Sequence, residues 1–246
     1  MKYKLYEVGG RVRDKFLGLP SKDVDYSVVI EVPEYLHLGI EAIFEGFVNQ
    51  IKSEGFQVFV ETPDCFTVRA KFPKNHIHAG LDADFVLARR EDGYIEGTRR
   101  PNVVLGNLYD DLVRRDFTVN AMAEDCNGKI IDPFNGQKDL LDRILRTPVD
   151  AVISFNDDPL RILRAFRFSI TKGLDFSREI IASIELFHPD KMNVVSTERI
   201  MMELEKMFKH DTPLSLRYLR WLEELNSGLY NNLFREGVWF LPTTKS

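Results

Sequence analysis

The pattern of hydrophobic residues changes after Gly136, and this change constrains the fold more than any other feature of the sequence. Before Gly136, short runs of β-branched and aromatic residues alternate with segments of helical periodicity. From Lys138 onward almost the whole pattern is helical, with interruptions mainly at prolines and glycines. We therefore predict an α+β fold, with an α/β head domain over residues 1–136 and a helical domain over residues 137–246.

The expected elements of the first domain follow from the local patterns. Helices are expected over residues 11–17 and from Pro33 to about Ser53. The polar segment 91–102 contains glycines and a proline and is predicted to be a mobile loop. Strands are expected over residues 3–8, 24–30, 56–60, 66–72, 83–88, 122–125 and 129–132.

Composition argues against several classes of protein. The chain of 246 residues is 44% hydrophobic, and it contains no apolar run near the roughly 18 residues of a membrane span. The N-terminus lacks the features of a signal peptide. Cys65 and Cys126 support neither a disulfide framework nor a zinc knuckle, which favours reduced thiols and a cytoplasmic protein. The net charge of −5 argues against non-specific coating of nucleic acid.

The segment around Gly9-Gly10 and Asp23-Val24-Asp25 carries the strongest indication of chemistry. Residues two apart in a strand point to the same face, so Asp23 and Asp25 are expected side by side. Adjacent carboxylates repel each other unless a cation lies between them, and Mg²⁺ prefers oxygen ligands completed by phosphates and water. The glycine turn lets backbone amides approach a triphosphate, and Arg13 lies within reach of the same phosphates.

A plainer interpretation exists for each part of this segment. An Asp-x-Asp pair is common and also fits a solvated strand edge, and a glycine pair also fits an ordinary strand-to-helix turn. The glycine turn lies about 13 residues before Asp23, and this combination favours a nucleotide site with a catalytic metal.

These residues and four later segments resemble the class II tRNA nucleotidyltransferase and bacterial poly(A) polymerase family. The first motif corresponds to Gly9-Gly10 through Asp25. The other four occur in the family's order as residues 114–123 (RRDFTVNAMA), 132–136 (DPFNG), 157–168 (DDPLRILRAFRF) and 196–204 (STERIMMEL). The fourth motif normally begins with Glu, and Asp157 replaces it here.

The resemblance implies a head domain of the DNA polymerase β type followed by a helical neck, with metal on Asp23 and Asp25. Asp84 matches the position of a third catalytic carboxylate, although an ordinary strand-edge acid fits the sequence equally well. The resemblance implies two-metal phosphoryl transfer with Mg²⁺, in which the protein mainly positions reactants and neutralises charge. It implies that the nucleotide contacts Gly9, Gly10, Arg13, Arg115, Asp116, Asp158, Arg161, Arg164 and Arg167.

The choice of nucleotide has a physical interpretation. Asp158 and Arg161 are three residues apart and are expected to be neighbours on one helix. A carboxylate accepts from the exocyclic amine of cytosine or adenine, and a guanidinium donates to the adjacent ring acceptors. Uracil and guanine present a carbonyl in place of that amine. The pair therefore predicts the use of CTP and ATP without a template.

The leading hypothesis is CCA addition or repair at the 3′ end of tRNA. Residues 90–101 resemble a flexible loop that CC-adding members tend to lack, which favours full CCA addition. An A-only or CC-only enzyme, a poly(A) polymerase and an idle RNA- or nucleotide-binding module remain open. Family members usually continue into body and tail domains, which this sequence is expected to lack. Dimerisation, a shorter RNA, or weak binding of the acceptor end are the expected compensations.

Overall fold

The chain forms two compact units in the computed structural model, which describes residues 1–21, 24–31, 38–94 and 101–238. The sheet unit consists of Met1–Arg115 and Val119–Gln137, and the helical unit of Asp116–Thr118 and Lys138–Ser246. Asp116–Thr118 therefore belongs with the helices, although the predicted boundary assigned it to the first domain. The physical reason is that Phe117 is fully buried and packs against Phe168 of the helical unit.

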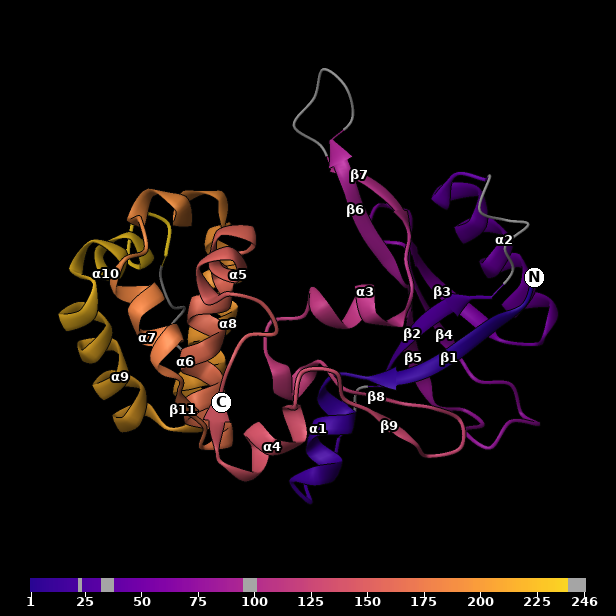
Figure 1. Cartoon of the computed structure of the whole chain (residues 1–246), viewed down its shortest axis with the longest axis horizontal. Helices are drawn as coiled ribbons and strands as arrows, with labels where there is room; N and C mark the ends of the chain where they lie inside the picture. The colour runs from indigo at the N-terminus through magenta and orange to yellow at the C-terminus, as the bar shows by residue number, and fades with distance from the viewer. Residues whose placement is uncertain (22–23, 32–37, 95–100, 239–246) are drawn as a thin grey trace, which may run out of the picture. The chain divides into compact units, whose positions relative to one another are not determined.

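A seven-stranded mixed sheet forms the centre of the sheet unit (Figure 1). Its strand order is β3-β4-β5-β2-β1-β8-β9. Only β2 and β5 pair in parallel, and the other neighbours are antiparallel. The strands are β1 (Tyr3–Val8), β2 (Asp25–Ile30), β3 (Gln57–Thr62), β4 (Thr67–Lys71), β5 (Asp82–Leu87), β8 (Ala123–Glu124) and β9 (Ile130–Ile131).

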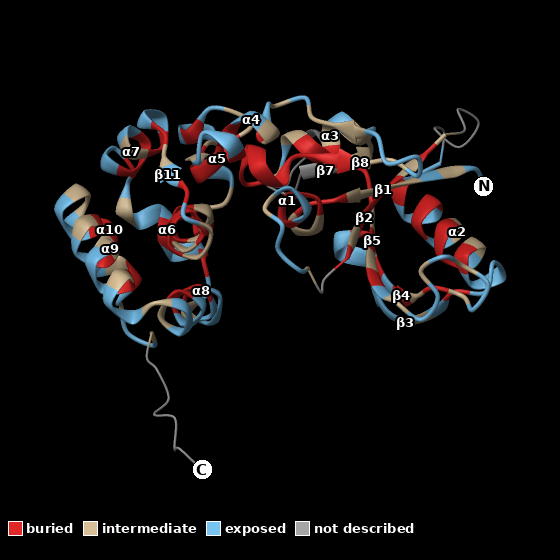
Figure 2. Ribbon diagram, turned by 90° about the horizontal axis from the view of Figure 1, so that it is seen from below, coloured by how far each residue is buried: buried red, intermediate tan, exposed pale blue. Residues whose placement is uncertain are grey.

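Helix α2 (Ile40–Ser53) covers one face of this sheet, with its buried side turned to the strands (Figure 2). Its apolar residues recur at helical spacing and form one core with the strand residues of that face, such as Tyr26 and Phe85. Each fully buried large side chain contributes roughly 1.5–3 kcal/mol. The prediction that the helix begins at Pro33 is wrong for the described part, because Gly39 is extended and α2 begins at Ile40. Pro33 itself lies outside the described residues.

The other face of the sheet carries a smaller core. Val8 packs there with Leu112 of α3 (Leu108–Val113) and with Ala121 and Ala123. A capping box begins α3: the Asn107 side chain accepts from the Asp110 amide at 3.1 Å, and the Asp110 carboxylate accepts from the Asn107 amide at 2.8 Å. Helix α1 (Gly10–Phe16) follows β1 directly, as the glycine pair predicts.

The segment 91–102 is not wholly a loop, and this prediction needs correction. Strands β6 (Arg89–Tyr94) and β7 (Pro101–Leu105) form an antiparallel hairpin, and residues 95–100 lie outside the described part. The β-branched pair Val103-Val104 favours a strand, and its pairing with Arg90 and Glu91 extends the hairpin into the polar segment.

Seven helices of the described chain account for most of the second half: α4 (Gly136–Leu141), α5 (Ala151–Asp157), α6 (Leu160–Lys172), α7 (Arg178–Glu185), α8 (Thr197–His210), α9 (Thr212–Leu225) and α10 (Ser227–Leu233). The predicted α+β class is confirmed. The helical unit is not entirely helical, because β10 (Ile144–Leu145) and β11 (Asp175–Phe176) form a short parallel pair. Within the described residues, no helix has the length and apolar character needed to span a membrane.

Helix α6 lies at the centre of the helical unit. Its residues Leu160, Ile162, Leu163, Ala165 and Phe166 are buried at helical spacing. Gly173 ends the helix in the left-handed conformation, with φ of 64°. The arginines of α6 (Arg161, Arg164 and Arg167) lie on its partly buried side, and none of its residues is fully exposed (Figure 2).

Candidate functional site

Asp25 and Asp84 are direct neighbours on the two parallel strands of the sheet. The register pairs Asp25 of β2 with Asp84 of β5. The next pair, Tyr26 and Phe85, is buried in the core beneath α2. Because successive residues of a strand point to opposite faces, Asp25 and Asp84 share the face that α3 partly covers. Asp23, the other predicted metal ligand, lies outside the described residues.

The carboxylate of Asp84 has a counter-ion on the next strand. Arg69 of β4 is its register partner on β5. The guanidinium Nε donates to Oδ1 at 2.7 Å, and Nη2 donates to Oδ2 at 2.6 Å. This is a bidentate ion pair, the geometry that a planar guanidinium makes best. Asp25, Asp84 and Arg69 therefore form a row across three strands.

Gly9 brings the backbone close to this row. Its φ of 72° and ψ of −132° suit glycine and very few other residues. A Cβ at this position would lie 2.9 Å from Nη1 of Arg115 and 3.6 Å from Oδ2 of Asp25. Three segments far apart in the sequence therefore meet at Gly9. Gly10 begins α1, and a Cβ there would lie 3.5 Å from Nη2 of Arg13.

Gly9→Ala should disturb the packing of Gly9 against Arg115 and Asp25. The left-handed backbone costs about 1–3 kcal/mol for a residue with a side chain, and the added methyl group pushes Arg115 aside. We expect a matching loss of unfolding free energy in a urea titration, together with weaker nucleotide binding. Gly80→Ala is the control, because its φ is 78° and nothing lies within 4 Å of its Cβ position. Equal nucleotide affinity in both variants would contradict a role for the Gly9 contact.

Arg13 is buried rather than exposed. It contacts Asp14 at 2.8 Å through Nε, and its Nη1 donates to Oδ1 of Asn120 at 2.6 Å. Asn120 belongs to the motif of residues 114–123, so the first two motifs are joined by this hydrogen bond. The predicted contact of Arg13 with phosphate stays a prediction.

Arg115 is held by a buried carboxylate that the sequence analysis did not select. Asp111 is fully buried and accepts from Nη2 of Arg115 at 2.9 Å and from Nη2 of Arg114 at 2.5 Å. Burial alone raises the pKa of Asp111, but the charges of Arg115 and Arg114 outweigh it and keep the pKa below its ordinary value of 3.8. Nε of Arg115 is buried and has no hydrogen-bond partner within the described chain. The hydrogen-bonding capacity of this donor is therefore unused.

In the helical unit, the predicted phosphate-binding arginines are paired with acids. Nε of Arg164 donates to Oδ2 of Asp116 at 2.9 Å, and Nη1 of Arg164 lies 3.8 Å from Oε1 of Glu203. Arg167 donates to the other oxygen of Glu203 and lies over the ring of Phe168, with Cζ 4.4 Å from the centroid. Glu203 is buried, so it fixes both arginines on the same side of α6.

The predicted placement of Asp158 and Arg161 on one helix is wrong. Asp158 is extended, with φ of −141° and ψ of 97°, because the following Pro159 disfavours the helical conformation at this position. Arg161 lies on α6, and its amide donates to the carbonyl of Asp158 at 3.0 Å. The Asp158 carboxylate accepts from Arg199 at 3.1 Å, while Nη1 of Arg161 donates to Oγ of Ser154 at 2.8 Å. A tight turn therefore keeps the two residues close.

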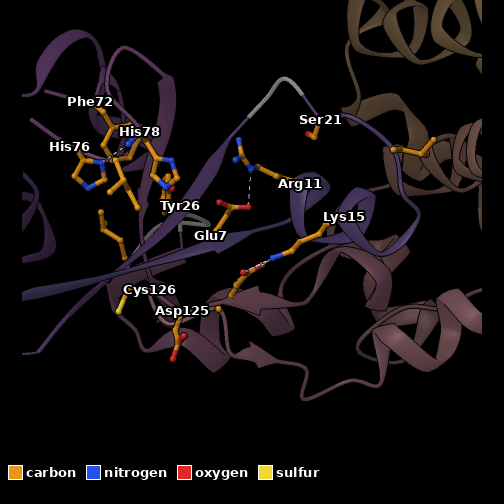
Figure 3. Close-up of a pocket in the computed structure, with 15 residues that line it drawn as sticks. Glu7, Arg11, Lys15, Ser21, Tyr26, Phe72, His76, His78, Asp125 and Cys126 are labelled. Carbon is orange, nitrogen blue, oxygen red and sulfur yellow. Dashed lines mark hydrogen bonds and ion pairs between the residues drawn. The ribbon is translucent and has the colours of Figure 1, made fainter. Parts of the chain in front are cut away.

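A pocket of about 640 Å³ lies beside β1 and α1, and neither Asp25 nor Asp84 lines it (Figure 3). Glu7 and Tyr26 line the pocket and are register partners on β1 and β2. Tyr26 directly follows Asp25, so the two side chains point to opposite faces of the sheet. Four of its charged side chains form two ion pairs: Arg11 lies 3.0 Å from Glu7, and Lys15 contacts Glu124 at 2.6 Å. The pocket is therefore separate from the candidate site.

The site residues that could not be selected from the sequence are hydrogen-bond or ion-pair partners of the predicted site residues. Asp111 had a local signal, because it precedes Arg114 and Arg115 by three and four residues in a helical segment. Asn120 and Glu203 stood in motifs but received no role. Arg69 had no signal, because its pairing with Asp84 depends on the register between β4 and β5.

Comparison with known proteins gives a consistent result. Residues 5–146 match the family model described as the poly(A) polymerase head domain. The chain is 33% identical over 236 residues to a CCA-adding enzyme of Geobacillus sp. (strain WCH70), covering 95% of this chain and 52% of that enzyme.

Solved structures agree with the sequence matches. The crystal structure of a Bacillus stearothermophilus CCA-adding enzyme in complex with CTP is similar with a TM-score of 0.68 at 32% identity, covering 92% of this chain and 50% of that one. A tRNA nucleotidyltransferase complexed with a primer tRNA and an incoming ATP analogue gives a TM-score of 0.64 at 30% identity, with 91% and 59% covered. The chain spans about half the length of the curated relatives that it matches.

Proposed function

Because the chain belongs to the poly(A) polymerase head-domain family, we propose that it is a magnesium-dependent nucleotidyltransferase. It transfers CMP and AMP from CTP and ATP to the 3′ end of tRNA, without a template, and releases pyrophosphate. In this proposal the sheet unit is the catalytic head and the helical unit is the neck. The cytoplasm is the proposed compartment, in keeping with two exposed free thiols at Cys65 and Cys126.

One observation carries the proposal: Gly9, Asp25 and Arg115 meet beside Asp84 on one face of the sheet. A glycine cradle, a carboxylate pair and an arginine with an unused buried donor are the parts that a nucleoside triphosphate and its cation require. The solved relatives in complex with CTP, or with a primer tRNA and an ATP analogue, support the same substrates for this chain.

The donor set fits magnesium. Asp25 and Asp84 supply carboxylate oxygens from adjacent register positions, and Asp23 is proposed as a further ligand from outside the described residues. No cluster of three or more His, Cys, Asp or Glu suited to a metal occurs among the described residues. Such a sparse set suits Mg²⁺, which keeps waters and takes phosphate oxygens as ligands. When bound, the cation would activate the RNA 3′-hydroxyl and offset the charge of the departing pyrophosphate.

The chain's own residues position the triphosphate. Gly9 lets the backbone approach closely, and Asp111 holds Arg115 in one orientation beside it. Arg164 and Arg167 are proposed to bind phosphate oxygens from the helical unit, where Asp116 and Glu203 orient their guanidinium groups before nucleotide arrives. Arg13 supports the glycine turn through Asn120 and Asp14.

Selection of the base is proposed for Asp158 and Arg161. The turn at Pro159 holds the two residues close, and Arg199 and Ser154 orient their side chains. Asp158 accepts from the exocyclic amine of cytosine or adenine, and Arg161 donates to the neighbouring ring acceptor. A carbonyl at the amine position leaves the carboxylate unpaired, so uracil and guanine are rejected.

The function is tested with Mg²⁺ and tRNA transcripts that end before, within and just short of CCA. CTP and ATP are supplied singly and together, and products are resolved to single nucleotides. We expect two C additions with CTP, one A addition to a transcript ending in CC, and full CCA with both. The same reactions in EDTA are the control and should give no product.

Other outcomes separate the alternatives. Long A tails on unrelated RNA would indicate a poly(A) polymerase, and addition restricted to C or to A would indicate a partial enzyme. Binding of CTP and ATP without extension of any RNA would identify an idle binding module and overturn the proposal.

A further inference from the structure

Asp84 presents both of its oxygens to Arg69 instead of to the open face of the site. Its side chain is 26% exposed, and that of Arg69 is 50% exposed. The pair lies directly beside Asp25, which is the register partner of Asp84 on the other side. The guanidinium of Arg69 therefore offsets the negative charge of Asp84, which a metal cation would otherwise have to do.

In this row of Asp25, Asp84 and Arg69, a metal cation and the guanidinium group would compete for the same carboxylate. Two carboxylates at adjacent register positions repel, and a neighbouring positive charge relieves the repulsion. A divalent cation that approaches Asp84 finds a carboxylate whose charge is already offset, and it is repelled by the guanidinium itself. Binding of the cation is easier when Arg69 withdraws from the carboxylate, for which its exposed side chain has room.

We propose that Arg69 is a positioning residue that serves as the built-in counter-ion of Asp84 and competes with the divalent cation for this carboxylate. The inference rests on the proposed function, because it concerns the cation of the same site. Arg69 stabilises the carboxylate row while no metal is bound, and it raises the cation concentration at which the site fills. Asp84 becomes a metal ligand only as the arginine leaves it.

Arg69→Gln tests this competition with Mn²⁺ alone as the probe. Free Mn²⁺ is counted by electron paramagnetic resonance during titration of the whole chain, without nucleotide. Because the ion pair is half exposed, we expect the dissociation constant for Mn²⁺ to fall about fivefold. The metal-free variant should also melt at a lower temperature than the parent chain, because the charge of Arg69 no longer offsets that of Asp84. Its melting temperature should rise more on addition of Mn²⁺ than that of the parent chain.

Two further variants make the test specific. Lys52→Gln is the matched control, because Lys52 pairs with Glu61 at 2.7 Å, is 47% exposed, and lies on α2 away from the row. It should leave Mn²⁺ affinity unchanged. In an Asp84→Asn background, Arg69→Gln should no longer tighten binding, because the contested carboxylate is gone.

The outcomes distinguish this inference from the proposed function. Unchanged Mn²⁺ affinity in Arg69→Gln, or tightening that persists in the Asp84→Asn background, would overturn the role of Arg69 while tRNA extension by the parent chain still stands. Absence of Mn²⁺ binding by both the parent chain and Arg69→Gln would overturn the metal site itself and the inference with it.

Discussion

Asp25→Asn is expected to lower the rate of CMP and AMP transfer about 10³-fold or more. An amide keeps the shape of the side chain but removes the negative charge that is proposed to hold the cation. Charge stabilisation by a metal is worth several kcal/mol at the transition state, and each factor of ten in rate corresponds to about 1.4 kcal/mol. Single-turnover extension of a tRNA transcript ending in CC, at saturating ATP, measures the loss. Asp23→Asn is expected to give a similar result.

The fold should survive this change. Asp25 is the first residue of β2, and its side chain lies outside the core that packs beneath α2. The melting temperature should therefore stay within a few degrees of the parent value. Glu61→Gln is the control for loss of a carboxylate at an exposed strand position, and it should retain full activity. Residual transfer by Asp25→Asn within tenfold of the parent rate would exclude Asp25 as a metal ligand.

Asp111→Ala is expected to reduce the unfolding free energy by about 3 kcal/mol. Removal of one partner from a buried ion pair typically costs 3–5 kcal/mol, because the remaining charge loses its compensation. The low end applies here, since the Arg115 and Arg114 side chains are 21% and 39% exposed and can turn toward water. Urea unfolding at neutral pH measures the effect. Asp142→Asn, which breaks an exposed contact with Lys138, should cost less than about 1 kcal/mol.

The dependence of the unfolding free energy on pH should show that the charge of the Asp111 carboxylate causes this stabilisation. The pKa of Asp111 lies below its ordinary value of 3.8 in the folded chain, so the unfolded chain binds the proton more readily. The stabilisation by Asp111 is therefore complete above pH of about 4 and is lost as the pH falls through the lower folded pKa. The stability gap between the parent chain and Asp111→Ala should be constant near neutral pH and narrow in acid. A gap independent of pH would point to lost packing instead of lost charge.

Much of the candidate site could be predicted because its motifs are local. The glycine turn, the following short helix and a strand bearing Asp25 each depend on a few neighbouring residues. The predicted strand 83–88 also placed Asp84 correctly on a strand, although the sequence left its role undecided, and the structure pairs that strand with β2.

Contacts between distant residues could not be predicted in the same way. Arg13 was expected to lie within reach of the phosphates, and it is buried against Asn120, which is 107 residues away in the chain. Arg164 and Arg167 were expected to contact the nucleotide, and in the structure they are paired with Asp116 and Glu203. A pattern of charges within one helix carries no information about acids that other segments bring beside it.

The sequence by itself determined the class of fold and the change from strands to helices near Gly136, and it predicted the chemistry proposed for the Gly9 to Asp25 segment. Those features depend on periodicity, turn residues and charge within short stretches of chain. The tertiary structure alone decided that Arg69 covers Asp84, that Asp111 holds Arg115, and that Asp158 stands in a turn before α6. The pairing of Arg69 with Asp84 depends on strand register, where a shift of one residue would turn the side chain to the opposite face. The other two outcomes depend on the close approach of Arg115 and on the turn that Pro159 imposes.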